Sequence, residues 1–169
     1  GDRASRRLAE SRPTPRTLRH PVTMLIYGVT GYTGRLILEE ALARGHRPVL
    51  SGRSAAAVEA LARQHGLEAR PAALDDPAAM QRALSGAGPV IHCAGPFLHT
   101  AQPMLAACLA ARVHYLDITG EIGVFEAMAA AHERGVHAGI TILPGVGFDV
   151  VPTDCLAAHL KRRLPGATS

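Results

Sequence analysis

The stretch Tyr27-Gly28-Val29-Thr30-Gly31-Tyr32-Thr33-Gly34 decides the fold of this 169-residue chain. It follows a short apolar run at residues 24–27 and precedes residues 35–44, which favour a helix. The three glycines have the spacing G-x-x-G-x-x-G between a strand and a helix. That spacing in that context is typical of turns that hold the phosphates of a dinucleotide.

Each glycine of this turn has its own expected role. We expect Gly28 to make the tight turn out of the strand, and Gly31 to let the backbone approach a pyrophosphate. Gly34 is expected to let the helix pack closely on the strand. The helix N-terminus would present free N–H groups to the phosphates. The hydroxyls of Thr30 and Thr33 would add donors, and Tyr32 belongs to the same turn. The candidate cofactor-binding residues of this turn are therefore Gly28, Thr30, Gly31, Tyr32, Thr33 and Gly34.

The rest of the chain continues the alternation of strand and helix. The expected strands are residues 24–27, 48–51, 67–74, 90–94, 114–118 and 139–143. The expected helices are residues 35–44, 55–65, 78–84, 102–111, 123–134 and 153–163. Each connection is long enough for a crossover between parallel strands. The sequence therefore predicts an α/β fold, a Rossmann-type doubly wound parallel sheet of about six strands.

The net charge of +4 is confined to the first residues of the chain. Residues 1–23 hold six arginines and two acids, whereas residues 24–169 hold twelve basic and twelve acidic side chains. We expect residues 1–23 to be a disordered basic leader, 24–164 the NAD(P)-binding Rossmann domain and 165–169 a truncated C-terminal tail. Because the domain itself has no excess charge, we predict no nucleic-acid partner; the leader's arginines lack the interleaved aromatic residues of many such binders.

The end of the second strand predicts which dinucleotide is bound. NAD-preferring domains usually carry an Asp or Glu here for the ribose 2′-hydroxyl, and none lies between Arg47 and Val58. Arg53 instead offers a guanidinium that can pair with a 2′-phosphate, beside Ser51 and Gly52. We therefore predict NADP (NADPH) as the cofactor.

Two later strand ends belong to the same cleft. Asp75, after the third strand, would line the adenine pocket. Cys93, Ala94, Gly95 and Pro96 follow the fourth strand, beside the point where such sheets bind their ligands. Cys93 has no activating neighbour in sequence, which favours a small buried residue over a nucleophile.

Other site types find little support. The three cysteines have no C-x-x-C spacing and the nine histidines no H-x-x-x-H pair, so we predict no metal site. No apolar run has the length of a membrane helix. Scattered cysteines fit a reducing compartment, and we expect a cytoplasmic protein with no membrane partner.

With these residues assembled, the chain resembles the NADP-binding half of the saccharopine dehydrogenase-like oxidoreductases. Within that group it is similar to bacterial members related to trans-acting enoyl reductase. The resemblance runs in order from residue 24 to about 164, and HYLDITGE and PGVGFDVVPTD are its most specific motifs. The matching segments are YGVTGYTG (27–34), GR (52–53), LDDP (74–77), HCAGPF (92–97), HYLDITGE (114–121) and PGVGFDVVPTD (144–154).

The resemblance implies an NADP-linked, enoyl-reductase-like enzyme whose second, substrate domain is absent from this chain. Asp117 or Glu121 could then serve as a general acid, but we favour a role in fixing local loops. The catalytic residues and the small-molecule substrate stay unassigned. The missing domain would leave apolar surface exposed, so a homo-oligomer is a possible outcome.

The sequence also bears on three alternatives. Short-chain dehydrogenases need Tyr-x-x-x-Lys, and Ala157 stands four residues before the only lysine, Lys161. Acyl-phosphate reductases need a cysteine motif that Cys155 lacks. A non-catalytic NADP-binding module, as a redox sensor or a docking protein, stays open beside the enzyme.

Overall fold

In the computed structural model, which describes residues 23–166, short strands alternate with helices along the chain. The strands of this part are β1 (Leu25–Tyr27), β2 (Val49–Ser51), β3 (Pro89–His92), β4 (His114–Asp117) and β5 (Ile142–Leu143). Its helices are α1 (Tyr32–Ala43), α2 (Ala55–His65), α3 (Pro77–Leu84), α4 (Phe97–Ala111), α5 (Ile122–Ala130), α6 (His132–Ala138) and α7 (Val151–Arg163). None of these helices is both long and apolar enough to cross a membrane. Residues 1–22 of the expected leader and 167–169 of the expected tail lie outside the described residues.

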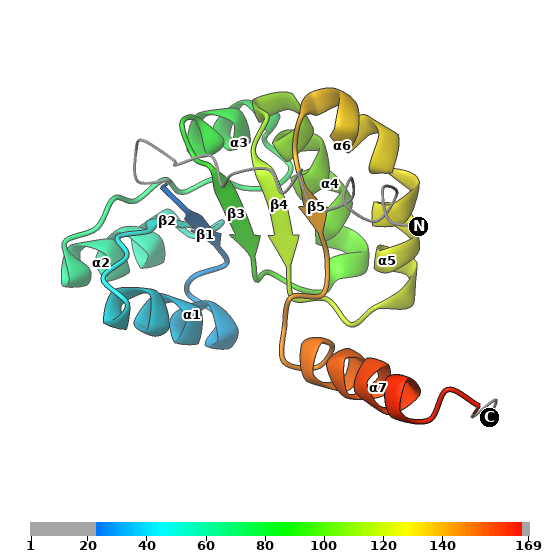
Figure 1. The fold of residues 1–169 in the computed structure, drawn as a ribbon. Coiled ribbons are helices and arrows are strands. Elements are labelled where there is room, and N and C mark those ends of the chain that lie inside the picture. Colours follow the sequence, from blue (N-terminus) through cyan, green and yellow to red (C-terminus); the bar gives the residue numbers. More distant parts are fainter. Residues whose placement is uncertain (1–22, 167–169) are drawn as a thin grey trace, which may run out of the picture.

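The strands form one parallel sheet in the order β2-β1-β3-β4-β5. From β1 the chain steps one way to β2, and from β3 it steps the other way to β4 and β5. Because crossovers between parallel strands are right-handed, this reversal places helices on opposite faces of the sheet. Figure 1 shows α1 and α2 in front of the sheet and α3 and α4 behind it. The doubly wound Rossmann-type fold predicted from the sequence is confirmed.

Each face of the sheet has its own hydrophobic core. Leu25 and Tyr27 of β1 belong to the larger core, under α3, α4 and α5. Ile26, which points the other way, packs in the smaller core with Leu38 of α1 and Val58 of α2. Burial on both faces explains why the strand is an uninterrupted apolar run.

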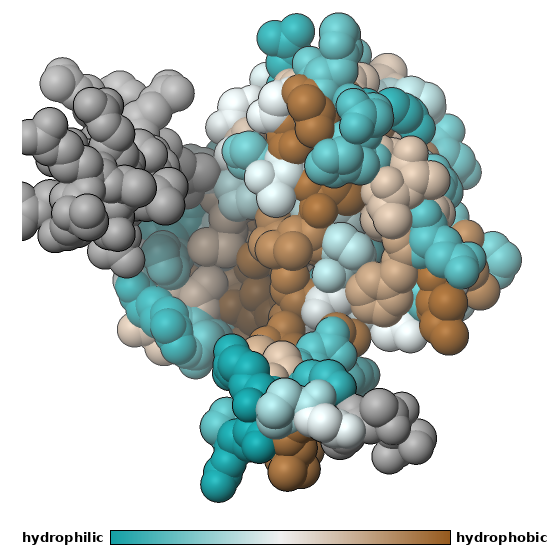
Figure 2. Space-filling model, turned by 45° about the vertical axis from the view of Figure 1, so that its right-hand side comes forward, coloured by the Kyte–Doolittle hydropathy of each residue, from teal (hydrophilic) through white to brown (hydrophobic). Residues whose placement is uncertain are grey.

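The front face is covered over only part of its width. The strand register aligns five apolar side chains in one row across this face: Leu50, Ile26, Ile91, Leu116 and Leu143. Leu50 and Ile26 are fully buried, Ile91 and Leu116 are half-buried, and Leu143 is 47% exposed. Figure 2 shows apolar surface in the hollow above α7, a helix with no buried residue. Within the described residues, no helix covers the β3–β5 half of this face.

The expected strand at residues 67–74 is the main difference from the prediction. The segment follows the outer edge of β2, where the amides of Arg70 and Ala72 donate to the carbonyls of Leu50 and Gly52. Only one bridge, between Leu50 and Ala69, results. Pro71, a residue confined to sheet edges, lies within this segment. The sheet of the described residues therefore has five strands rather than about six.

Helix boundaries also differ from the prediction, and the differences are largest in three places. The helix α1 begins at Tyr32 rather than at residue 35, and α4 begins at Phe97 rather than at 102. Pro103, a residue that would suit the first turn of a helix, lies inside α4. The single helix expected at 123–134 is divided at Ala131 into α5 and α6.

Candidate cofactor-binding site

A cleft of about 580 Å³ opens at the carboxyl ends of β1, β2 and β3. This is the edge of a doubly wound sheet where ligands bind, at the point where the strand order reverses. The cleft is lined by Tyr27, Gly28, Thr30, Gly31, Gly52, Arg53, Ala73, Leu74, Asp75, Cys93, Ala94, Gly95, His99, Thr100 and Pro103.

The glycine-rich turn forms one wall of this cleft. Gly28 has a φ of +82°, a conformation that favours glycine, and a Cβ there would lie 2.9 Å from the amide nitrogen of Ala94. Gly31 precedes α1 as its N-cap residue, so the free N–H groups of the first turn follow it directly. A Cβ on Gly34 would collide with the Gly28 carbonyl oxygen and lie 2.7 Å from Val29 Cα. Gly34 thus allows the close packing of helix on strand that its position predicts.

The end of β2 supplies the positive charge of the cleft. Arg53 lines the cleft in the loop between β2 and α2, and its charge acts on the Tyr27 hydroxyl. Burial raises the pKa of Tyr27, against the opposing effect of Arg53, and the hydroxyl donates to the Ala72 carbonyl at 3.0 Å. Ser51 differs from the expectation: it is fully buried, and its hydroxyl donates to the Arg70 carbonyl at 2.7 Å.

The segment after β3 forms the opposite wall. Burial raises the pKa of the Cys93 thiol to about 12, so the reactive thiolate is scarce at neutral pH. The Gly95–Pro96 peptide bond is cis, and α4 begins directly after it. Ala94 and Gly95, both small residues, line the cleft on this side.

His92 fixes the beginning of α4 to the sheet. The Thr100 hydroxyl donates to the Pro96 carbonyl at 3.1 Å, so His92 Nε2, 3.1 Å from that hydroxyl, must donate to it. His92 Nδ1 is then the unprotonated nitrogen, and it is buried with no hydrogen-bond partner among the described residues. Burial lowers the pKa of His92 to about 4, which keeps the ring neutral at neutral pH.

Asp117 organises the loops after β4 and β5. Its fully buried carboxylate accepts hydrogen bonds from the Tyr115 hydroxyl at 2.5 Å, from the Thr119 amide at 3.0 Å and from the Gly145 amide at 2.9 Å. Burial, and then the bond to Asp117, raise the pKa of Tyr115. The loop-fixing role favoured for Asp117 agrees with these bonds.

Glu121 ties the same region to α4. Its two carboxylate oxygens accept from the amides of Phe97 at 2.9 Å and Leu98 at 2.7 Å, the first residues of that helix. These amides have no partner within the helix, so Glu121 caps it from a distant loop. Both acidic residues of the HYLDITGE motif therefore bind backbone amides.

Nine of the fourteen predicted residues line the cleft together: Gly28, Thr30, Gly31, Gly52, Arg53, Asp75, Cys93, Ala94 and Gly95. Tyr32, Thr33, Gly34, Ser51 and Pro96 are not among its lining residues. Sequence reasoning missed Ala73, His99, Thr100 and Pro103. His99 and Thr100 lie in the segment 97–101, which was not expected to be helical. The signal that could have found them is Pro96, which suits the position just before a helix.

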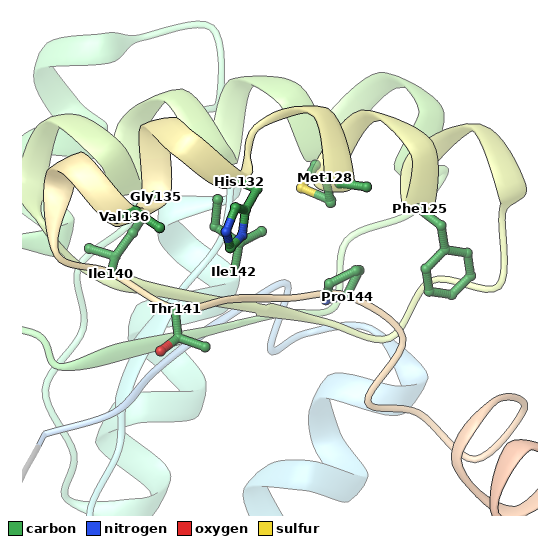
Figure 3. Close-up of a pocket in the computed structure, with 10 residues that line it drawn as sticks. Phe125, Met128, His132, Gly135, Val136, Ile140, Thr141, Ile142 and Pro144 are labelled. Carbon is green, nitrogen blue, oxygen red and sulfur yellow. The ribbon is translucent and has the colours of Figure 1, made fainter. Parts of the chain in front are cut away.

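A second cavity, of about 480 Å³, lies between β5 and the helices α5 and α6. Figure 3 shows its lining side chains, which are mostly apolar, with His132 and Thr141 as polar members. It lies at the edge of the sheet and holds no acidic residue, arginine or lysine. The cleft at the strand ends is therefore the better candidate for binding a charged cofactor.

The comparisons with known proteins agree with this geometry. The family model described as the saccharopine dehydrogenase NADP-binding domain matches residues 24–143. A human saccharopine dehydrogenase-like oxidoreductase is 26% identical, over 89% of this chain and 40% of the relative. A putative trans-acting enoyl reductase of Mycobacterium tuberculosis is 32% identical, over 78% of this chain and 33% of the relative. The chain thus spans between a third and two fifths of the length of these relatives.

Solved structures show the same fold. The saccharopine dehydrogenase (L-Glu forming) of Saccharomyces cerevisiae has a TM-score of 0.73 at 17% identity, covering 85% of this chain and 31% of that one. The Citrobacter triphenylmethane reductase complexed with NADP(H) has a TM-score of 0.57 at 19% identity, covering 72% and 48%. The family match, the fold and the cleft lead to one assignment: the chain belongs to the saccharopine dehydrogenase family through its NADP-binding domain, and its cofactor is NADP(H).

Proposed function

We propose that this domain holds NADPH as the hydride donor of a reductase whose substrate is bound by a further domain. The observation that carries the proposal is Arg53, which lines the cleft at the end of β2 with no carboxylate between Arg47 and Val58. A guanidinium in that place favours a 2′-phosphate, which distinguishes NADPH from NADH.

The cleft suggests how the cofactor lies. The pyrophosphate rests on Gly28, Gly31 and the N-terminus of α1, where backbone N–H groups and the helix dipole favour anions. The adenine lies toward Leu74 and Asp75, and the nicotinamide extends past Ala94 and Gly95. Tyr32, Thr33, Ser51 and Pro96 act on the cofactor only through the shape of the turns that contain them.

The relatives suggest the chemistry of the whole protein. Two of them are named as an oxidoreductase and as a putative trans-acting enoyl reductase. We assign to the full-length protein the transfer of a hydride from NADPH to an enoyl or imine acceptor. Specificity for that acceptor resides in the part of the relatives that this chain does not span.

A non-catalytic NADP-binding module is the second candidate. The observation in its favour is that Asp117 and Glu121, the acids nearest the nicotinamide side, already accept backbone N–H groups. Within residues 23–166, both carboxylates are thus engaged as hydrogen-bond acceptors, and neither is free to donate a proton to a substrate.

The first test is a titration of residues 1–169 with NADPH and with NADH, in which fluorescence reports binding. The second test is a set of turnover assays with enoyl and imine acceptors. We expect saturable NADPH binding that is tighter than NADH binding. Binding without hydride transfer to any acceptor would support the second candidate. An absence of NADPH binding contradicts both.

The variant Gly31→Val probes the turn directly. A Cβ on Gly31 lies only 3.3 Å from the Gly28 carbonyl, and the valine methyl groups would occupy the space assigned to the pyrophosphate. We expect NADPH binding to be lost while the circular dichroism spectrum is retained. Unchanged affinity in this variant would show that the phosphates lie elsewhere.

Compartment and assembly complete the proposal. The cysteines Cys93, Cys108 and Cys155 are free thiols, which suits the reducing cytoplasm. The uncovered half of the front face gives residues 1–169 a surface for self-association, which light scattering of the purified chain measures.

A further inference from the structure

Tyr27 ends β1 and lines the cleft, although its side chain is almost fully buried. Its hydroxyl donates to the Ala72 carbonyl at 3.0 Å, which joins two segments that are far apart in sequence. The Ala72 amide donates to the Gly52 carbonyl at 3.0 Å, in the loop after β2. The backbone of Ala72 is therefore held on both sides, by the end of β1 and by the end of β2.

Ala72 directly precedes one wall of the cleft. Ala73, Leu74 and Asp75 line the cleft, and we call them the 73–75 wall. Beyond Ala72 the chain leaves the edge of β2 and turns, with the Asp76 amide donating to the Ala73 carbonyl at 3.2 Å. Within residues 23–166, the two bonds of Ala72 are the last hydrogen bonds that link the chain to the sheet before this wall.

The surroundings of the Tyr27 hydroxyl keep it a hydrogen-bond donor. Burial raises the pKa of Tyr27, the charge of Arg53 opposes this increase, and the charge of Asp75 adds to it. Because the raised pKa lies above the ordinary value near 10, the hydroxyl stays protonated at neutral pH. The ring itself packs against His92, with ring centroids 5.6 Å apart. The ring is thus held by a contact that does not need the hydroxyl.

We propose that the Tyr27 hydroxyl is a positioning group for the adenosine half of NADP(H), through the 73–75 wall. The inference rests on the proposed placement of the adenine toward Leu74 and Asp75. The hydroxyl acts through the wall and not on the cofactor, because its proton is donated to Ala72. Without it, the buried Ala72 carbonyl loses this donor and the wall is less well ordered. The cofactor must then order the wall as it binds, which lowers its affinity.

The test compares Tyr27→Phe with Tyr115→Phe at neutral pH. Both changes remove one buried phenolic hydroxyl that donates a hydrogen bond, but Tyr115 donates to Asp117 and does not line the cleft. The probes are NADP⁺ and adenosine 2′,5′-bisphosphate, which has the adenosine and the 2′-phosphate but no nicotinamide. Their dissociation constants are measured by calorimetry on residues 1–169.

We expect Tyr27→Phe to weaken the binding of both probes by the same factor, roughly three- to tenfold, because both contain the adenosine half. Tyr115→Phe should keep the affinity of the unmodified chain for adenosine 2′,5′-bisphosphate. Both variants should lose stability toward urea, since each loses a buried hydrogen bond. A merely structural role of Tyr27 would therefore lower its stability without this selective loss of affinity.

Amide hydrogen exchange in residues 73–75, measured without cofactor, reports on the wall itself. We expect faster exchange there in Tyr27→Phe than in Tyr115→Phe or the unmodified chain, and slower exchange once NADP⁺ is bound. Exchange at the same rate in all three proteins would overturn the proposal.

The binding data can overturn it in three further ways. These are unchanged affinity of Tyr27→Phe for both probes, a loss confined to NADP⁺, and an equal loss in Tyr115→Phe. If the unmodified chain binds neither probe, the proposed function fails instead.

Discussion

The two halves of the sheet differ in how far helices cover their faces. In the half formed by β1 and β2, helices cover both faces, and the row of side chains through Leu50 and Ile26 is fully buried. In the half formed by β3, β4 and β5, the same row continues through Leu116 and Leu143 and becomes progressively exposed. Figure 1 shows these strands with no helix in front of them. The half that contains the glycine-rich turn is thus complete in itself, because helices cover both of its faces, whereas the other half keeps one face uncovered within the described residues.

The halves also differ in how their loops are held. Close approaches of backbone shape the loop after β1, where glycine is needed because a Cβ would collide. In the other half, carboxylates hold the loops by accepting from backbone amides distant in sequence: the buried Asp117 accepts from Gly145, and the half-buried Glu121 from Phe97. The first arrangement can be recognised in one stretch of sequence, and the second requires knowledge of which segments meet.

The largest effect is expected from Gly34→Val in the complete half. The added Cβ would collide with the Gly28 carbonyl and lie 2.7 Å from Val29 Cα, both backbone atoms that cannot move aside. We expect a loss of about 3 kcal/mol or more in the free energy of unfolding, measured with urea. The control is Gly120→Ala, where a Cβ meets nothing within 4 Å. Equal stability of the two variants would contradict the close packing of α1 on β1.

A pair of leucine truncations tests the comparison itself. Leu50→Ala empties a fully buried position under α1 and α2, and we expect it to cost about 2–5 kcal/mol in the free energy of unfolding. Leu143→Ala lies in the same row but 47% exposed, so we expect a cost below about 1 kcal/mol. Equal costs would show that the β5 end of the row is covered after all, for example by a second copy of the chain.

The sequence predicted some elements of each half better than others. The helix at Ala55–His65 has the predicted bounds, because Ser54 and Gly66 mark both of its ends. The strand expected at 67–74 was wrong, because this segment follows the edge of β2 and forms only one bridge with it. The expected start of α4 was also wrong, because the helix begins at Phe97, directly after Pro96, and His99 was missed with it. The capping of α4 by Glu121 could not be predicted, because it joins residues 24 apart in sequence.

His92 lies at the boundary between the halves and makes stability depend on pH. Its pKa of about 4 in the folded chain is below the value near 6.5 expected after unfolding. The unfolded state therefore takes up the proton first, and stability falls as the pH drops below about 6.5. Between pH 7 and 4.5 we expect a loss of about 2–3 kcal/mol from this group.

The measurement is urea unfolding of the chain and of His92→Gln at both pH values. The amide of glutamine can still donate to Thr100 but does not titrate in this range. The variant should therefore lose about 2–3 kcal/mol less than the unmodified chain on acidification. His137→Gln, at an exposed position, should lose as much as the unmodified chain. A common pH dependence for all three proteins would mean that His92 is protonated without cost in the folded state.

The smallest effect tests whether the complete half recognises the cofactor by itself. Arg53→Ala removes the positive charge at the end of β2, and we expect NADPH binding to weaken by about 1–3 kcal/mol. NADH lacks the 2′-phosphate, so its binding should change much less. Arg82→Ala, an exposed arginine on α3 that does not line the cleft, controls for the loss of charge. Equal losses for NADPH and NADH would contradict the role of Arg53. A selective loss in residues 1–169 would instead mean that this part of the chain is sufficient to choose between the two cofactors.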